Sequence, residues 1–142
     1  SSSRLPDRLY DFLAEGVTEQ VTIVGGTASV SAGIEQEIRS MHVHVQRFAG
    51  ANRYETNARL NAHIAMIGPT PNTYAVVATG RDFPDALTGS TLAVSAGASL
   101  VLSEPTCMPA SVRAVIEQES VDVLVLTGGP ASLAESVRTQ TC

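Results

Sequence analysis

The residue types best suited to ligand chemistry are concentrated in residues 47–56, which read Arg-Phe-Ala-Gly-Ala-Asn-Arg-Tyr-Glu-Thr. Arg47 and Arg53 carry guanidinium groups, which bind carboxylates and phosphates through paired hydrogen bonds. Tyr54 adds an aromatic ring, while Asn52 and Thr56 add neutral polar groups. We therefore predict that these five side chains contact an anionic ligand.

Neighbouring carboxylates leave a structural alternative, in which Arg53 forms an ion pair with Glu55, Asp82 or Asp85. Asp82 and Asp85 are three positions apart, which places both on one side of a helix. Such a pair could perform glycosidic acid–base catalysis. It could equally stabilise a helix start, with Asp82 as the cap and Asp85 in the first turn. We favour capping, because no further catalytic group accompanies the pair, and we keep Asp85 as a candidate ligand contact.

The remaining reactive residue types form no catalytic or metal-binding pattern. Neither a G-x-S-x-G nucleophile turn nor an H-E-x-x-H zinc motif occurs. His42 and His44 alternate along a predicted strand and so share one face, and we interpret them as surface residues rather than metal ligands. With no P-loop and no G-x-G-x-x-G either, we predict no catalytic residues, no metal and no cofactor.

The two cysteines, Cys107 and Cys142, are too few to form a zinc site by themselves. They can pair as one disulfide that ties the last residue to a loop, which would indicate an oxidising compartment. The alternative is two unrelated thiols.

Short apolar runs alternate with stretches of helical spacing along the chain. The runs that predict strands are residues 21–24, 43–45, 74–78, 99–102 and 123–126. Most of them are apolar on both faces, which is typical of parallel strands covered on both sides. Strands that alternate with helices predict an α/β sandwich with a mostly parallel sheet of about five strands.

The helical stretches between these strands carry apolar stripes. We expect Gly68-Pro69 to end one helix. The next helix, which contains Leu87, Leu92 and Val94, is rich in alanine and could be fully buried. Ser132 and Glu135 have the spacing of a capping box at the start of the final helix.

Two Gly-Gly turns belong to an internal repeat. Gly25 and Gly26 follow one strand, Gly128 and Gly129 follow another, and the two pairs are 103 positions apart, the difference between 128 and 25. Flanking residues match at the same offset. We interpret residues 5–46 as the second half of one repeat and residues 47–142 as a complete repeat, within a single domain of residues 1–142. The turns could bind an anion on free helix amides, but we favour simple tight turns.

The charge and the apolar runs argue against two kinds of protein, those that bind nucleic acid and those that span a membrane. The formal net charge is −5 and no basic run occurs, so we expect no binding to nucleic acid. No apolar run approaches the roughly 18 residues that a membrane-spanning helix requires.

Three phrases of the sequence together resemble the cell wall-binding repeat 2 family of secreted Gram-positive proteins, including clostridial surface-layer proteins. The first is R-x-x-G-x-x-R-Y-x-T, formed by Arg47, Gly50, Arg53, Tyr54 and Thr56. The second is A-x-G-x-x-F-P-D-A-L, at residues 78–87, and the third is an apolar strand followed by Gly-Gly, which occurs twice. One departure is the strand at residues 98–102, where the family often has Pro-Ile-Leu-Leu.

The resemblance implies a Rossmann-like or toprim-like three-layer fold and a non-catalytic role. It implies secretion to the cell wall or cell surface, and anchoring to an anionic polysaccharide or a teichoic-acid-like polymer. Such repeats usually pack in threes, so adjacent repeats or a homo-oligomer, with a trimer as one form, are expected partners. The alternatives are a structural oligomerisation domain without polymer affinity and an accessory domain of a wall hydrolase.

Overall fold

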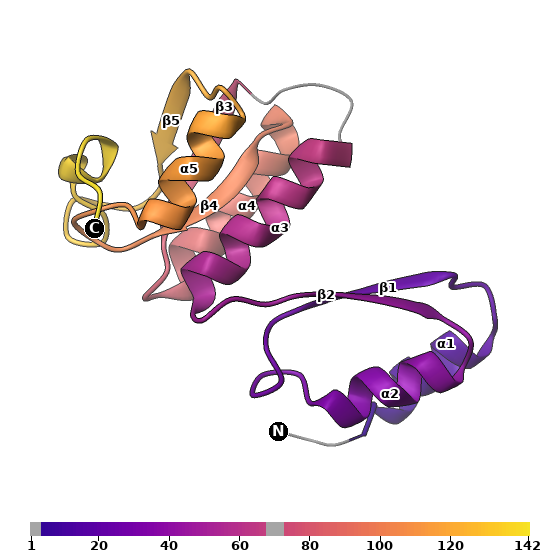
Figure 1. The fold of residues 1–142 in the computed structure, drawn as a ribbon. Helices are drawn as coiled ribbons and strands as arrows, with labels where there is room; N and C mark the ends of the chain where they lie inside the picture. Colours follow the sequence, from indigo (N-terminus) through magenta and orange to yellow (C-terminus); the bar gives the residue numbers. More distant parts are fainter. Residues whose placement is uncertain (1–3, 68–72) are drawn as a thin grey trace. The chain divides into compact units, whose positions relative to one another are not determined.

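A computed structural model describes residues 4–67 and 73–142, which fall into two compact units, Ser1–Gly50 and Ala51–Cys142 (Figure 1). Among these residues the first unit has a two-stranded sheet and the second a three-stranded sheet, and every strand pair is parallel. The α/β class and the parallel strands predicted from the sequence are confirmed. No helix within the described ranges is long and apolar enough to cross a membrane.

The first unit packs two helices on one face of its sheet. Its elements are α1 (Asp7–Ala14), β1 (Gln20–Val24), α2 (Ala32–Ser40) and β2 (His44–Phe48). Leu13 of α1 and Ile38 of α2 are buried together with Ile23 and Val45 of the two strands. Because side chains alternate along a strand, the Val24 side chain is on the face of the sheet opposite to that of Val45. Val24 is 49% exposed.

The strand β2 differs from its prediction at both ends. It begins at His44, opposite Gln20, and continues to Phe48, opposite Val24. His42 is outside it, in a turn with a φ of 64°. The prediction that His42 and His44 share a strand face is therefore wrong. Arg47 belongs to the strand rather than to the connection after it.

The second unit contains a three-stranded sheet with the order β4-β3-β5. Ala75 of the central strand lies opposite Ser99 of β4 and Leu124 of β5. The elements are α3 (Arg53–Ile67), β3 (Tyr74–Thr79), α4 (Phe83–Ala96), β4 (Ser99–Ser103), α5 (Ala110–Gln118), β5 (Val123–Leu126) and the 3-10 turn η1 (Glu135–Arg138). The expected end of α3 at Gly68-Pro69 lies outside the described residues.

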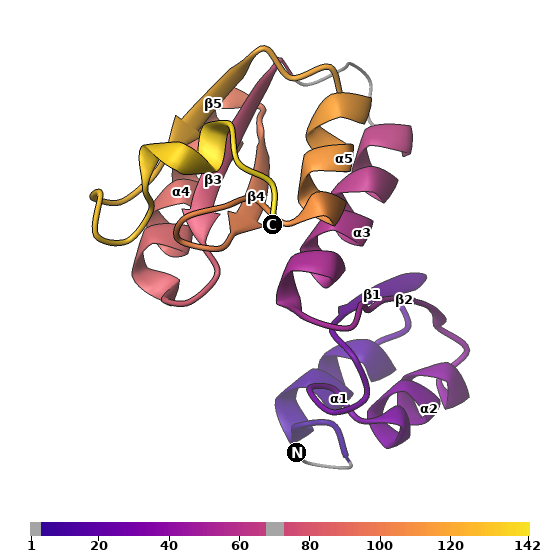
Figure 2. The same ribbon diagram turned by 60° about the vertical axis from the view of Figure 1, so that its left-hand side comes forward.

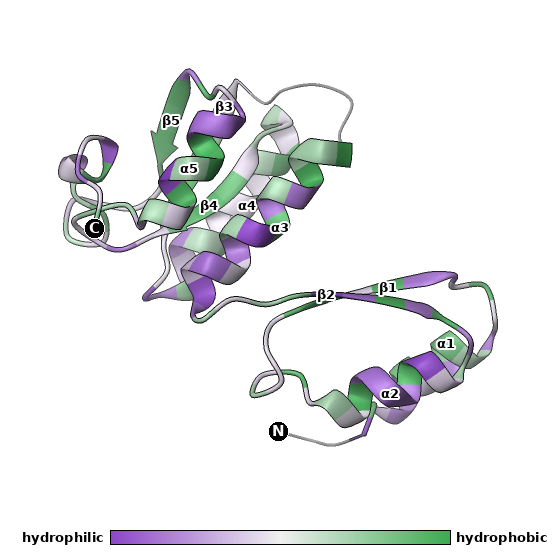
Figure 3. Ribbon diagram, in the orientation of Figure 1, coloured by the Kyte–Doolittle hydropathy of each residue, from purple (hydrophilic) through white to green (hydrophobic). Residues whose placement is uncertain are grey.

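Helices cover both faces of this sheet (Figures 1 and 2). On one face α3 and α5 pack side by side, and their buried Ala58, Val112 and Ile116 form one core with Val77 of β3. On the other face α4 packs against β3 and β4. The strands β4 and β5 stand out as hydrophobic segments in Figure 3.

The prediction that the alanine-rich helix is fully buried is wrong. Only Gly89 and Ala93 of α4 are buried, whereas Leu87, Leu92 and Val94 are 61%, 41% and 83% exposed. The helix meets the strands through its smallest side chains, because an added Cβ at Gly89 would lie 3.2 Å from side-chain atoms of both adjacent strands. The larger apolar side chains consequently point outward.

Backbone hydrogen bonds in the two units recur at the same 103-residue offset as the sequence match. The first glycine of each Gly-Gly turn has a positive φ, 129° at Gly25 and 103° at Gly128, which favours glycine. The carbonyl of the second glycine accepts two backbone N–H groups, at 2.9 and 3.0 Å in both units. These donors are Ser29 and Val30 in the first unit and Ser132 and Leu133 in the second.

The final helix is shorter than predicted, and Ser132 does not cap it. In the first unit, α2 follows Ser31, whose hydroxyl accepts a hydrogen bond from the Ile34 N–H at 3.4 Å. The residue 103 positions later is Ala134, which has no side-chain acceptor. Loss of this cap removes a stabilising bond from the helix start. Only the 3-10 turn η1 forms there.

Candidate functional site

The carboxyl ends of β3, β4 and β5 meet at one edge of the three-stranded sheet, because all three strands are parallel. Ligands of open α/β sheets bind at this edge. Gly80 and Arg81 follow β3, Glu104 follows β4, and Thr127 follows β5. Residues of all three phrases that belong to the second unit lie at this edge, with Arg53 and Tyr54 from the first, Gly80 and Asp85 from the second and Gly128 from the third, and they form the candidate site.

The second half of the first phrase forms the start of α3. The Asn52 side-chain oxygen accepts a hydrogen bond from the Glu55 N–H at 2.9 Å, and the Glu55 carboxylate accepts one from the Ala51 N–H at 2.8 Å. The Thr56 hydroxyl donates to the Asn52 carbonyl at 2.9 Å. The structure thus engages Asn52 and Thr56, both predicted ligand contacts, in the first turn of the helix.

Arg53 and Tyr54 join the first phrase to the second through Gly80. The Arg53 guanidinium donates to the Gly80 carbonyl, and the Tyr54 ring lies directly over the Gly80 Cα. A Cβ at Gly80 would overlap this ring, with the Tyr54 Cζ only 3.0 Å away. Glycine is therefore needed at this position so that the aromatic ring can approach the backbone. The structural partner of Arg53 is a carbonyl, not one of the carboxylates considered from the sequence.

Tyr54, Glu104 and Arg81 form a polar chain across the edge. Burial raises the pKa of the Tyr54 hydroxyl, and its hydrogen bond with Glu104 raises the pKa further. The Arg81 Nε lies 3.3 Å from the Glu104 carboxylate, and its side chain is 68% exposed. Sequence reasoning missed Arg81 and Glu104. Their positions two or three residues after the ends of predicted strands are the signal that could have identified them.

Asp85 joins the second phrase to the third. Its carboxylate fills the space that a Cβ at Gly128 would occupy, with the Asp85 Cγ 2.8 Å from that position. The Thr127 hydroxyl lies 3.3 Å from the Asp85 backbone carbonyl and 3.1 Å from the Val77 carbonyl, to which it donates. Asp85 thus packs against the Gly-Gly turn. Asp82 occupies the N-cap position of α4, but its side chain makes no capping hydrogen bond, so its predicted role as a side-chain cap is wrong.

The Gly-Gly turns do not open helices directly, as the anion-binding reading required. In the first unit, residues 27–31 separate Gly26 from the start of α2. In the second unit, the Asp85 carboxylate already lies against Gly128, and a ligand anion there would be repelled by it. The geometry therefore agrees with tight turns at Gly25, Gly26, Gly128 and Gly129.

Arg47 is held inside the first unit. Its Nε lies 2.8 Å from the Glu35 carboxylate, its Nη1 donates to the Gly25 carbonyl at 2.7 Å, and its side chain is 14% exposed. Hydrogen bonds from Arg39, and next from Arg47, lower the pKa of Glu35 despite some opposing desolvation. Arg47 consequently links β2 to α2 and to the Gly-Gly turn.

Cys107 and Cys142 are joined in a disulfide, which confirms the pairing considered from the sequence. It ties the segment after β4 to the last residue, where the Cys142 N–H also donates to the Met108 carbonyl at 2.9 Å. Within residues 4–67 and 73–142, no group of three or more His, Cys, Asp or Glu side chains is arranged to hold a metal ion. Two exposed arginines, Arg53 and Arg81, lie at this edge of the sheet.

The chain matches one protein family and resembles several known proteins. The family described as Cell wall binding domain 2 (CWB2) matches residues 47–138, which contain all three phrases. N-acetylmuramoyl-L-alanine amidase LytC of Bacillus subtilis (strain 168) is 31% identical over 137 residues, covering 96% of this chain and 27% of LytC.

Two solved structures share the fold. Cwp8 from Clostridium difficile superposes with a TM-score of 0.77 at 27% identity, over 93% of this chain and 22% of Cwp8. Cwp6 from the same organism gives a TM-score of 0.78 at 23% identity, over 95% of this chain and 21% of Cwp6. The chain thus spans only about a quarter of the length of these proteins.

Proposed function

This chain belongs to the cell wall binding domain 2 family, and from that premise we propose that it is a non-catalytic module attaching a secreted protein to the bacterial cell wall. Its ligand would be an anionic secondary polymer, either a polysaccharide or a teichoic-acid-like chain. The observation that carries the proposal is the pair of exposed guanidinium groups, Arg53 and Arg81, at the carboxyl edge of the three-stranded sheet.

The surroundings of these two arginines favour an anionic ligand. Within the described residues, no carboxylate lies within ion-pairing distance of Arg53, and its guanidinium donates to the neutral Gly80 carbonyl. Arg81 has only a long, solvent-exposed pair with Glu104, and such pairs contribute little energy. A phosphate or carboxylate of the polymer could replace Glu104 at little cost. In a chain with a formal net charge of −5, these groups provide the local attraction.

Binding by one module is expected to be weak, because two guanidinium contacts at the surface are screened by salt. Attachment to a wall becomes firm when several modules bind one polymer network, since each additional contact is then intramolecular. The assay must therefore present the polymer as a dense surface.

The test is cosedimentation of the chain with Gram-positive cell walls, half of them acid-extracted to remove secondary polymers. We expect binding to native walls, loss of binding after extraction, and weaker binding as salt rises. Arg53→Ala and Arg81→Ala should each reduce the bound fraction at least threefold. Arg53→Lys should retain part of the binding, because it keeps the charge but loses the bidentate geometry.

Arg59→Ala is the matched control, because it removes one positive charge from the exposed, Glu55-paired face of α3 rather than from the edge. It should bind like the unmodified chain. If Arg59→Ala and Arg81→Ala reduce the bound fraction equally, the change in net charge would explain both losses. That result would contradict the proposed site. Binding that survives extraction would contradict the polymer as ligand, and a folded chain that binds neither preparation would favour a structural role.

A further inference from the structure

Glu104 lies between two hydrogen-bond donors at the carboxyl edge of the three-stranded sheet. Its carboxylate accepts a hydrogen bond from the Tyr54 hydroxyl, and the Arg81 Nε lies 3.3 Å from it. Arg53 and Arg81 both interact electrostatically with the Tyr54 hydroxyl, so positive charge surrounds this point. One carboxylate of the chain therefore occupies two donors that suit an anion, one from residues 47–56 and one from residues 78–87.

The backbone that carries Glu104 is held more firmly than its side chain. The Ser103 side chain is buried, and its hydroxyl lies 3.0 Å from both the Glu104 and the Cys107 carbonyl oxygens. The disulfide holds Cys107 as well. The Glu104 side chain, in contrast, is 33% exposed. Rotation of this side chain can therefore move the carboxylate away from Tyr54 and Arg81 without moving the loop.

The two donors are better positioned than the carboxylate that they hold. The Arg81 backbone N–H donates to the Thr79 hydroxyl at 3.2 Å, and the Tyr54 ring packs on Gly80. The ion pair between Arg81 and Glu104 is weak, because the Arg81 side chain is 68% exposed and water screens the two charges. An anion that replaces the carboxylate meets donors whose backbone or ring is already fixed, which lowers the entropy cost of binding.

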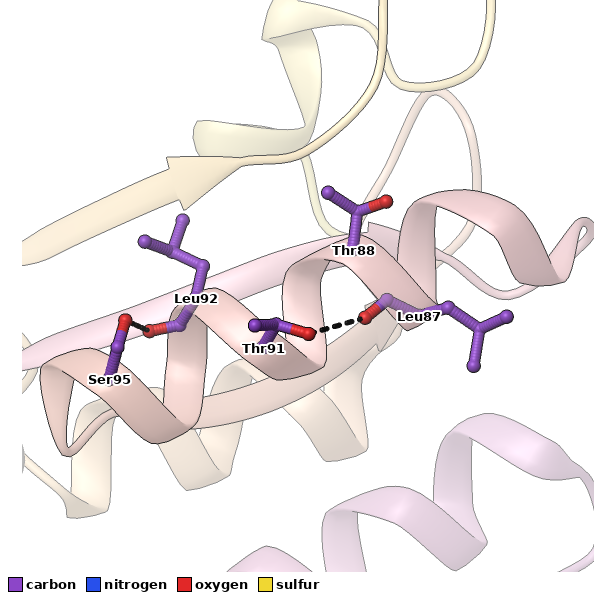
Figure 4. A pocket seen from close by; sticks show the side chains of 5 residues that line it. All are labelled: Leu87, Thr88, Thr91, Leu92 and Ser95. Atoms are coloured by element: carbon purple, nitrogen blue, oxygen red, sulfur yellow. Dashed lines mark hydrogen bonds between the residues drawn. The ribbon is translucent and has the colours of Figure 1, made fainter.

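The open groove along α4 offers no comparable place for an anion (Figure 4). Its lining side chains, Leu87, Thr88, Thr91, Leu92 and Ser95, carry no charge. The Thr91 hydroxyl donates to the Leu87 carbonyl at 3.5 Å, and the Ser95 hydroxyl donates to the Leu92 carbonyl at 2.8 Å, as Figure 4 shows. These donors are used within the helix, whereas the donors beside Glu104 are held by a carboxylate that can leave.

We propose that the Tyr54 hydroxyl and the Arg81 guanidinium form one subsite for an oxyanion, a phosphate or a carboxylate, and that Glu104 is an internal competitor for this subsite. The Glu104 carboxylate marks the place that the anion of the ligand takes, and it rotates away when the ligand binds. Because the competitor is attached beside the subsite, its effective concentration is high, and it lowers the affinity for every anion. The polymeric nature of the ligand rests on the proposed function, but the subsite can be tested with a simple anion.

Titration with inorganic phosphate at constant ionic strength tests the subsite, with the complete chain and its disulfide intact. The Nε–H signals of the arginine side chains in NMR spectra report binding. Glu104→Gln should bind phosphate about two- to fivefold more tightly than the unmodified chain, which is the range expected for the loss of one exposed ion pair. Adding Tyr54→Phe to Glu104→Gln should remove most of this gain, because the donor hydroxyl is lost while the ring remains. The same series with acetate tells whether the subsite prefers a carboxylate to a phosphate.

Glu117→Gln is the matched control, because it also removes one negative charge, from an exposed position in the last turn of α5. It should bind phosphate like the unmodified chain. A purely structural role for Glu104 predicts equal or weaker phosphate binding in Glu104→Gln, and that result would overturn the proposal. An equal gain in Glu117→Gln would also overturn it, and a gain that persists without the Tyr54 hydroxyl would overturn the proposed pair of donors.

Cosedimentation with native cell walls separates this inference from the proposed function. Glu104→Gln should raise the bound fraction of the chain. Tighter phosphate binding by Glu104→Gln, without wall binding by either protein, would support the subsite and contradict the polymer as ligand. Wall binding that is the same with and without the Glu104 charge would support the polymer and overturn the competition.

Discussion

Substitution of Gly80 by Ala tests how the first two phrases of the site are joined. The new methyl would occupy the space of the Tyr54 ring, whose Cζ and Cδ1 would lie 3.0 and 3.2 Å from the added Cβ. Tyr54 would have to move away, which would strain its hydrogen bond with Glu104. We expect Gly80→Ala to destabilise the second unit, and we expect the loss of unfolding free energy to be smaller when the Tyr54 ring is absent.

The size of the effect follows from overpacking. Forcing one methyl into an occupied site costs about 1–3 kcal/mol of unfolding free energy. Truncation of the half-buried ring by Tyr54→Ala costs about 2 kcal/mol on its own. In a Tyr54→Ala background the methyl at position 80 has space, and its cost should fall below about 0.5 kcal/mol.

The assay is a double-mutant cycle measured by urea unfolding and followed by far-UV circular dichroism. The four proteins are the unmodified chain, Gly80→Ala, Tyr54→Ala and the double variant. Their coupling energy should be at least about 1 kcal/mol, with the double variant more stable than the sum of the single changes predicts. Gly129→Ala serves as a control, because nothing lies within 4 Å of a Cβ added there.

A Gly80→Ala cost that is the same with and without the Tyr54 ring would refute the reasoning. That outcome would mean that glycine is required at position 80 for its backbone conformation and not for the contact with the Tyr54 ring.

Three further predictions concern other contacts. Replacing Cys107 and Cys142 by Ala should lower the unfolding free energy by about 3–4 kcal/mol in the chain-entropy model, because the disulfide closes a loop between residues 35 positions apart; thermal unfolding with and without reductant measures this. Gly128→Ala should cost about 2 kcal/mol or more, because its φ is 103° and its Cβ space is filled, whereas Gly129→Ala should be nearly neutral; similar costs in urea unfolding would contradict this account. The pKa of Glu35 lies below its ordinary value of 4.5, so its stabilisation is present above that value and is lost as the pH falls through the folded-state pKa. Glu35→Gln should therefore flatten the acid side of the stability profile, and an unchanged profile would show that Glu35 contributes nothing to it.

Much of the local structure could be predicted from the sequence. The strand at residues 123–126 was predicted with its observed bounds, and the strands that begin at Tyr74 and Ser99 were predicted to within one residue. Strand and helix signals depend on residues that are neighbours in the chain, so periodicity and β-branched side chains suffice to find them. The disulfide could be anticipated because the chain has only two cysteines.

Predictions that depended on tertiary contacts were less successful. The composition of α4 indicated burial, yet its leucines point outward because the smallest residues, Gly89 and Ala93, fit against the strands. Arg47 and Arg53 were grouped by sequence proximity, yet each is held by a different partner, Glu35 in one case and the Gly80 carbonyl in the other.

The sequence by itself determined the alternation of strands and helices, the parallel sheets and the three phrases that identify the family. Only the tertiary structure decided that Tyr54 needs a glycine at position 80, and that Asp85 fills the space beside Gly128. These contacts join residues that are 26 and 43 positions apart, the differences between their residue numbers. Their geometry depends on the strand order β4-β3-β5, which brings the carboxyl ends of three strands to one edge. No local pattern encodes that order, because it depends on pairing between strands that are far apart in the chain.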